Sequence, residues 1–246
     1  MQPMIALQDL TLAYDRHPAV HHLSGAFAKG SLTAVIGPNG AGKSSLLQAL
    51  AGLKKPAEGK MLFDGIARHD VSYLPQYQAI DETFPISVLD VIQMGHWHRV
   101  GPFRAINKAL HQQSHAALSS VGLDGFADRA FGSLSVGQRQ RVLFARLMVA
   151  DSRLILLDEP FTAIDTRTTK DLLRLVERWH GEGRTIIAVL HDFEQVRRHF
   201  PQALLMAREL VAWGATPTVL TSENLLAARA MSEAWDVDAD ICRGAA

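Results

Sequence analysis

Three short, almost entirely apolar runs of residues constrain the fold of this chain more than any other feature of its sequence. The runs span residues 32–36, 154–157 and 186–190. Each run stops at a polar or glycine-rich corner, and these corners are Gly37, Asp158 and His191. Continuous apolar runs predict strands of a parallel sheet that is covered on both faces. Helix-period segments follow the runs, at residues 43–53, 166–180 and 192–200. This order predicts an α/β fold with a candidate ligand site at the three corners, where the strands end.

Two other regions do not fit the parallel sheet. Residues 4–33 and residues 60–73 alternate weakly between apolar and polar, the second with an Asp64-Gly65 turn, so we expect a small antiparallel layer. Between about residues 78 and 150 the pattern turns helical, with Gly122 as a C-terminal cap. We predict a single domain over residues 1–246, in which residues 1–77 and 150–246 form the core and the antiparallel layer, and residues 78–150 form an inserted helical lobe.

Composition excludes several classes of protein. The chain has 246 residues, 48% of them hydrophobic, which excludes disordered and fibrous classes. Its 25 Lys+Arg balance 25 Asp+Glu, so no overall field exists to attract nucleic acid. The single Cys242 excludes an intrachain disulfide and fits a reducing compartment. We find no signal-type opening and no run of about 18 apolar residues, so we expect a chain that is neither secreted nor membrane-spanning.

The first corner carries a phosphate-binding pattern. Residues 37–44 fit G-x-x-x-x-G-K-[ST] between a predicted strand and a predicted helix. Glycines let backbone N–H groups turn inward around phosphate oxygens, and the amino end of the helix adds about half a positive charge. In such loops the lysine, here Lys43, reaches the β- and γ-phosphates, and the Ser44 hydroxyl ligates Mg²⁺. The alternative is a glycine-rich turn that merely starts a helix. We predict a nucleotide site made of Gly37, Pro38, Asn39, Gly40, Ala41, Gly42, Lys43, Ser44 and Ser45.

The other two corners carry ionisable side chains. Asp158 and Glu159 are adjacent, and they project in different directions because side chains alternate along a strand. Asp158 fits the second Mg²⁺-orienting group of a P-loop NTPase, and Glu159 is placed to accept a proton from an attacking water. Incidental acids at a solvated strand end are the alternative. A lone histidine such as His191 is more often structural than catalytic, and Asp192 fits the N-cap of the next helix.

A further segment completes an ordered set of motifs. Residues 134–138 read Leu-Ser-Val-Gly-Gln, and with them the chain resembles, over nearly its whole length, the ATP-binding cassette of ABC transporters. That family usually has Leu-Ser-Gly-Gly-Gln, so Val136 replaces one glycine while Ser135, Gly137 and Gln138 are retained. The Ser135-x-x-Gln138 spacing is also a capping box, and an ordinary capped helix is the alternative. The resemblance implies an ATPase with a P-loop NTPase (RecA-like) parallel sheet core, an antiparallel β layer and an inserted helical subdomain.

The resemblance implies how ATP is bound. Two cassettes pair head to tail, and the segment with Ser135, Gly137 and Gln138 closes on ATP held by the partner's phosphate loop. Tyr14 is similar to the aromatic that stacks on adenine, although an exposed strand tyrosine is an alternative. Asp165 resembles part of the loop that links the two sites, and it also fits an N-cap.

The resemblance also implies how ATP is hydrolysed. His191 matches the histidine that contacts the γ-phosphate, and Gln76 is similar to the glutamine that touches Mg²⁺ and the water. The implied catalytic residues are therefore Glu159, His191, Lys43 and Gln76. The implied Mg²⁺ ligands are Ser44, Gln76 and Asp158.

Partners follow from the same resemblance. A cassette without a spanning segment passes its motion to an integral membrane permease, which docks near Gln76, at the cytoplasmic face of the inner (plasma) membrane. Residues 84–88 and 91–95, and a Trp213-Gly214 turn before residues 219–221, look like those of metal importers. We therefore favour a bacterial zinc or manganese importer, with a solute-binding protein as an indirect partner. The alternatives are importers of siderophores, haem or cobalamin, exporters, and soluble cassettes that act on nucleic acid or ribosomes.

The 11 histidines do not by themselves predict a metal site. His111 and His115 stand four residues apart on a predicted helix, and His96 and His98 lie nearby in the sequence, but no third ligand is placed with them. We expect these histidines to lie on a solvated helix face.

Overall fold

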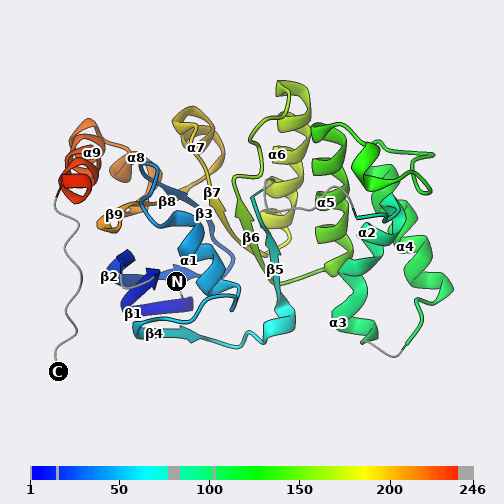
Figure 1. The fold of residues 1–246 in the computed structure, drawn as a ribbon, viewed down its shortest axis with the longest axis horizontal. Coiled ribbons are helices and arrows are strands. Elements are labelled where there is room, and N and C mark those ends of the chain that lie inside the picture. The colour runs from blue at the N-terminus through cyan, green and yellow to red at the C-terminus, as the bar shows by residue number, and fades with distance from the viewer. Residues whose placement is uncertain (1, 15–16, 77–83, 102–103, 238–246) are drawn as a thin grey trace.

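A six-stranded sheet forms the centre of the computed structural model, which describes residues 2–14, 17–76, 84–101 and 104–237 (Figure 1). The strand order is β5-β6-β7-β3-β8-β9. The first five strands run parallel, and β9 pairs antiparallel with β8 at the edge. The strands are β3 (Leu32–Ile36), β5 (Val71–Leu74), β6 (Leu154–Asp158), β7 (Thr185–Val189), β8 (Gln202–Ala207) and β9 (Glu209–Ala215).

A second, three-stranded antiparallel sheet lies beside the first, with the order β2-β1-β4. Its strands are β1 (Pro3–Tyr14), β2 (His17–Ala28) and β4 (Glu58–Phe63). Helix α1 (Lys43–Leu50) packs between the two sheets, because its buried face, with Leu46, Leu47 and Leu50, belongs to one hydrophobic core with the inner side chains of both. This core fixes α1, and with it the loop that precedes α1, against β3.

Helices cover the other face of the central sheet. They enclose a second hydrophobic core that contains Ile155, Leu157 and Ile186, whereas the alternating residues Leu154, Leu156 and Ile187 face the first core. Both faces of the central strands are therefore covered, which explains their almost entirely apolar runs. The remaining helices are α2 (Val88–Gln93), α3 (Trp97–Val100), α4 (Lys108–Ser120), α5 (Val136–Ala150), α6 (Thr166–Gly181), α7 (Phe193–His199), α8 (Thr216–Val219) and α9 (Ser222–Val237). Single 3-10 turns are η1 (Arg68–Asp70), η3 (Met94–His96) and η4 (Phe131–Ser133).

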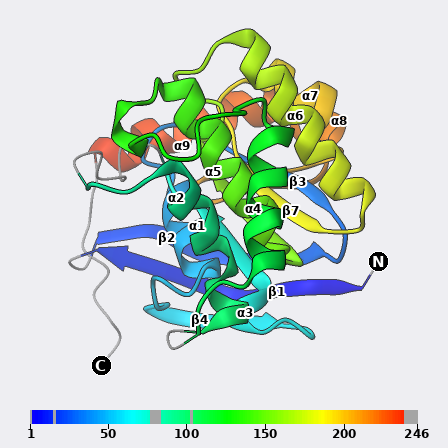
Figure 2. The ribbon, with the colours of Figure 1, turned by 90° about the vertical axis from the view of Figure 1, so that its right-hand side faces the viewer.

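Figure 1 shows α4, α5 and α6 side by side, with α5 in the middle, and Figure 2 views the same helices from the side of α4. Side-chain caps define where the last two begin: the Ser135 hydroxyl accepts from the N–H of Gln138 at the start of α5, and Asp165 accepts from the N–H of Thr168 at the start of α6. Buried Leu172, Val176 and Trp179 recur at helical spacing along α6 and face the sheet. The predicted fold class is confirmed, whereas the division into a core and a helical lobe stays a prediction.

Two details of the expected strands were wrong. Residues 60–73 do not form one antiparallel unit, because β4 joins the small sheet while β5 pairs in parallel with β6. The pair Trp213-Gly214 is not a turn but lies inside β9. There Trp213 packs against Phe27, with 4.6 Å between ring centroids, and so ties β9 to β2 of the small sheet. Weak alternation in sequence could not distinguish these pairings, since strand partners are set by long-range packing.

The expectation of a solvated histidine face holds for only part of its set. His111 and His115 are exposed on α4, but His96 is fully buried. Its Nε2 lies 3.2 Å from the carbonyl oxygen of Leu110 and 3.2 Å from the Ser114 hydroxyl. Within the described ranges, no three His, Cys, Asp or Glu side chains are arranged to hold a metal ion. A search of the same ranges finds no helix with the length and hydrophobicity needed to span a bilayer.

Candidate functional site

The phosphate-loop pattern lies between β3 and α1, at the carboxyl edge of the central sheet. Gly42 caps α1 in a left-handed conformation, with φ of 86°, and a Cβ there would lie 2.0 Å from the carbonyl oxygen of Ala19. Gly37, with φ of 150°, would bring a Cβ to 2.0 Å from the carbonyl oxygen of Met206. Only glycine fits at these positions, so the pattern requires glycine where the loop backbone passes close to the carbonyl oxygens of Ala19 and Met206.

A cavity of about 290 Å³ opens over this loop. The cavity is lined by this loop and by the catalytic candidate Glu159, which directly follows the carboxyl end of β6. The other lining residues are Ala19, Asn39, Gly40, Ala41, Gly42, Lys43, Ser44 and Ser45. Gly37 and Pro38 line a larger neighbouring cavity of about 720 Å³, together with His191 and residues of α9. The nine residues predicted for the nucleotide site therefore border two adjoining cavities.

Lys43 bends back over its own loop. Its Nζ donates to the carbonyl oxygens of Gly37 at 3.0 Å and Pro38 at 2.7 Å. Burial lowers the pKa of Lys43, and the negative charges of Glu159 and Asp158 oppose that shift. The ammonium is thus held by the loop, within the electrostatic influence of two carboxylates, a position suited to an anionic phosphate tail.

The predicted Mg²⁺ ligands Ser44 and Asp158 meet across the site. The Ser44 hydroxyl donates to Asp158 Oδ1 at 2.9 Å. Burial raises the pKa of Asp158, although the hydrogen bonds from Ser44 and Tyr73 oppose this. A hydroxyl and a carboxylate oxygen are hard ligands, the kind that Mg²⁺ prefers, so the residues present fit that ion.

Tyr73 is a site residue that sequence reasoning missed. Its hydroxyl donates to Asp158 Oδ2 at 3.2 Å and so fixes the second carboxylate oxygen. Its place at the end of β5, three residues before the predicted Gln76, was the available signal. That signal became readable only once β5 was known to lie beside β6.

Glu159 collects donors from two other predicted residues. His191 Nε2 lies 2.7 Å from one carboxylate oxygen, and Gln76 Nε2 donates to the other at 3.0 Å. Burial alone would raise the pKa of Glu159, but the hydrogen bond and charge of His191, with smaller contributions from Gln76 and Lys43, outweigh burial and leave the pKa below its ordinary value. Glu159 has a φ of 50°, so the chain turns sharply after β6 and aims this carboxylate away from Asp158. The two acids have distinct surroundings, as their adjacency predicted.

The remaining predicted residues form a second group at the amino ends of α5 and α6. Ser135 and Gln138 make the reciprocal capping box, with bonds of 3.0 and 3.3 Å between each backbone N–H and the other's side chain. Asp165 caps α6, and donation from the hydroxyl and N–H of Thr168 lowers the pKa of its carboxyl. Gly137 lies against this cap, since a Cβ there would be 3.7 Å from Asp165 Oδ2.

No hydrogen bond or ion pair among the described residues joins this second group to the phosphate loop. Within the described residues the two groups are therefore separate clusters of polar contacts. Tyr14 ends β1, and its side chain lies outside the described part of the structure.

Comparisons with known proteins place this geometry in context. The family model described as "ABC transporter" matches residues 20–162. The chain is 35% identical over 226 residues to the manganese transport system ATP-binding protein MntB of Halalkalibacterium halodurans, covering 91% of this chain and 90% of the relative. It is 37% identical to the zinc transport system ATP-binding protein TroB of Treponema pallidum, covering 89% and 84%.

Solved structures show the same likeness. One chain of a transporter assigned to the metal-chelate ABC type, in an inward-facing conformation, superimposes with a TM-score of 0.82 at 31% identity and covers 93% of this chain and 90% of its own. A cassette solved as a dimer after hydrolysis, with ADP and phosphate bound, superimposes with a TM-score of 0.77 at 23% identity, covering 87% and 99%. At that lower identity the second match bears on the fold alone.

Proposed function

The chain belongs to the ABC transporter family as an ATP-binding ATPase, and from this premise we propose that it drives a bacterial importer of zinc or manganese. The observation that carries the catalytic half is the cavity of about 290 Å³ in which the phosphate loop and Glu159 meet. The transport half is supported by relatives named for manganese and zinc systems at 35% and 37% identity.

In the proposed reaction a water molecule attacks the γ-phosphoryl group in line. The loop amides and Lys43 hold the phosphate tail, and Glu159 accepts the proton of the water. His191 and Gln76 keep that carboxylate ionised and oriented, since both lie within 3.0 Å of its oxygens. Ser44 and Asp158, with Gln76 nearby, would hold Mg²⁺, which neutralises charge on the β- and γ-phosphates.

We propose that a second copy of the chain completes the site. Ser135, Gly137 and Gln138 stand at the amino end of α5, which has no hydrogen bond to the phosphate loop among the described residues, and a helix amino end favours an anion. Head-to-tail pairing would bring this end, with Asp165, to the ATP held by the other copy. Each chain would then contribute half of two ATP sites.

The membrane partner in this proposal is a permease that docks beside Gln76, at the cytoplasmic face of the membrane. Large apolar side chains are exposed where the helical segment begins: Phe84 is 61% exposed and Trp97 is 67% exposed. We propose that they lie in the docking surface, on a helical lobe at residues 78–150 that moves as a unit on the core.

Two experiments test the proposal at its two levels. Purified chain should bind labelled ATP in the presence of Mg²⁺ and release phosphate, and failure to retain nucleotide would contradict the ATPase assignment of the site. Purification from membranes with its permease, followed by growth of a deletion strain under chelation, should show rescue by zinc or manganese. Rescue only by a siderophore, haem or cobalamin would keep the importer but replace its substrate.

A further inference from the structure

Gln140 and Phe144 on α5 hold this helix against the first half of the loop that runs from Glu159 to Asp165. Gln140 is buried, and its Nε2 donates to the carbonyl oxygen of Pro160 at 2.7 Å. Phe144, one turn further along α5, lies 6.3 Å from Phe161 between ring centroids. The first half of the loop is therefore held against α5 directly behind Glu159.

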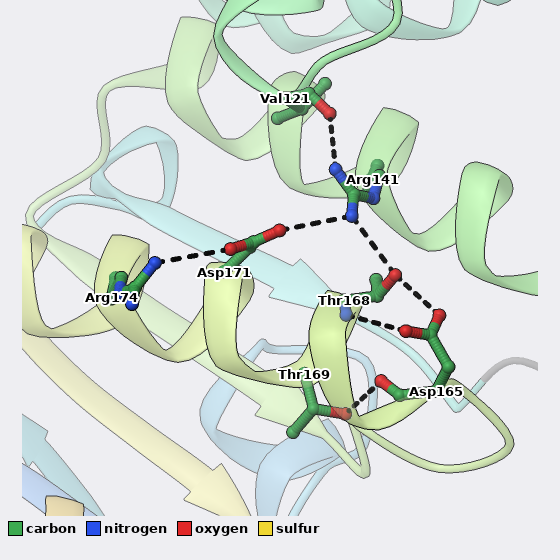
Figure 3. A network of polar contacts seen from close by, with 7 residues as sticks. All are labelled: Val121, Arg141, Asp165, Thr168, Thr169, Asp171 and Arg174. Atoms are coloured by element: carbon green, nitrogen blue, oxygen red, sulfur yellow. Dashed lines mark hydrogen bonds and ion pairs between the residues drawn. The ribbon is translucent and has the colours of Figure 1, made fainter.

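Arg141 fastens the other end of the loop (Figure 3). Its Nη1 donates to the carbonyl oxygen of Val121 at 2.9 Å, at the end of α4. Its Nη2 donates to the Thr168 hydroxyl at 3.1 Å and to Asp171 Oδ2 at 3.2 Å, both on α6. One planar guanidinium thus joins α4, α5 and α6, a geometry that a lysine ammonium does not reproduce.

The Thr168 hydroxyl passes this contact on to Asp165. A guanidinium only donates, so the hydroxyl must accept from Arg141 and direct its single proton to another acceptor. That acceptor is Asp165 Oδ2, at 2.7 Å, while the N–H of Thr168 donates to Oδ1 at 2.9 Å. Thr168 is 5% exposed, so water does not compete freely for these bonds.

The same cluster supports the signature segment of α5. Gly137 lies over Asp165 and Thr168, with the position of a Cβ 3.7 Å from an oxygen of each. The signature segment therefore lies against the same two residues, Thr168 and Asp165, through which Arg141 reaches the loop that carries Glu159.

We propose that Arg141 is a positioning residue for ATP hydrolysis, acting through Thr168 on Asp165, and that with Gln140 it forms a clamp between α5 and the loop at residues 159–165. This inference rests on the proposed function, because it assigns a role in that reaction. The clamp makes the catalytic carboxylate of one site and the signature segment of the other move together. Its loss should impair turnover rather than the binding of ATP to the phosphate loop.

The test compares substitutions at the two ends of the relay in the full chain. Arg141→Lys keeps the charge but not the fork, and Thr168→Val keeps the shape but not the hydroxyl. We expect each to lower kcat about tenfold or more while KM for ATP changes by less than about twofold, the signature of an interaction lost only in the transition state. Thr168→Ser restores the hydroxyl and should restore kcat.

Arg174→Gln is the matched control. Arg174 reaches the same Asp171 at 3.5 Å but is 75% exposed and touches neither Thr168 nor Asp165. It should leave kcat unchanged. A Thr168→Val variant that retains the parent kcat would overturn the proposal, whether or not Arg141→Lys folds.

Hydrogen exchange supplies a readout that does not require ATP hydrolysis. Without nucleotide, Thr168→Val should accelerate amide exchange at residues 159–165, and Arg174→Gln should not. Unchanged exchange would count against the clamp alone. If the parent chain fails to hydrolyse ATP while Thr168→Val still exchanges faster than the parent at residues 159–165, the result would count against the proposed function and leave the clamp supported.

Discussion

Replacing Glu159 with glutamine removes one charge and one base from the site with little change in shape. Glu159 accepts at both oxygens, from His191 Nε2 at 2.7 Å and from Gln76 Nε2 at 3.0 Å. A glutamine amide offers one acceptor and one donor, so one neighbour must reverse its role. Gln76 does so by rotating its own amide, and a neutral imidazole does so by accepting at Nε2. We therefore expect Glu159→Gln to fold with the site geometry retained.

The expected loss is that of a general base. Such a group contributes about 10² to 10⁴ in rate, or about 2.7 to 5.4 kcal/mol at 1.36 kcal/mol per factor of ten. The full loss is expected because the surroundings of Glu159 hold its pKa below the ordinary value, so the parent carboxylate is ionised at neutral pH. ATP binding should not weaken, because removing a negative charge lowers repulsion of the γ-phosphate. An ATP-trapped dimer should therefore accumulate.

The assay is phosphate release by the purified chain at saturating ATP and Mg²⁺, with light scattering to measure the mass with and without ATP. Glu194→Gln is the control, since Glu194 is an exposed acid on α7 that pairs with Arg197 at 3.3 Å outside the site. It should hydrolyse ATP like the parent. Turnover of Glu159→Gln within about threefold of the parent is far short of a base's share and would refute the role. Light scattering that shows only monomer with ATP would refute the trapping argument.

Three further predictions concern stability. Asp158→Asn should raise the melting temperature of the nucleotide-free chain, by about 2–4 °C per kcal/mol gained, because burial raises the pKa of Asp158. A raised carboxyl pKa means that stability falls as pH rises through the window above about 3.9, so the advantage of this variant, measured by calorimetry, should be large at pH 7 and shrink towards pH 4. Gly42→Ala should destabilise the fold and abolish ATP binding. Its control is Gly183→Ala, because Gly183 has a similar φ of 82° but no atom within 4 Å of the new Cβ, so this variant should lose only the about 1–2 kcal/mol of a left-handed alanine. Equal losses of unfolding free energy in chemical denaturation would show that the clash at residue 42 is unimportant. Burial lowers the pKa of His96, so stability should fall as pH drops below about 6.5, and His96→Gln should flatten the melting temperature between pH 7.5 and pH 5.5; an unchanged slope would contradict this.

The sequence predicted the parts of the site that depend on local pattern. Residues 37–44 required a tight turn between strand and helix, and Gly42 shows why, because no side chain fits beside Ala19. Apolar runs covered on both faces marked the strands, and their ends located Asp158 and His191 at one edge. Each of these inferences needs only the residues within a single strand, turn or helix.

Contacts between distant residues were not predicted. The bond from Tyr73 to Asp158 spans 85 positions, and Arg141 meets Asp171 across 30. Tyr73 lies in a strand that weak alternation assigned to the wrong sheet. Trp213, expected in a turn with Gly214, lies in β9. Without the pairing of β5 with β6, nothing in the sequence set Tyr73 apart from an ordinary strand tyrosine.

In the proposed pairing each chain contributes half of two ATP sites, and the proposed clamp would make these two halves move together. The phosphate loop is fixed by the core between the two sheets, and the signature segment by α5. The loop after β6 begins at Glu159, in the cavity over the phosphate loop, and ends at Asp165, beside Gly137 of the signature segment. If this loop moved independently of α5, closure of this chain's signature segment on the partner's ATP would leave Glu159 unplaced in its own site. In the proposed clamp Gln140 and Arg141 hold its two ends, so closure and placement of the base would become one event, and hydrolysis before pairing would be disfavoured.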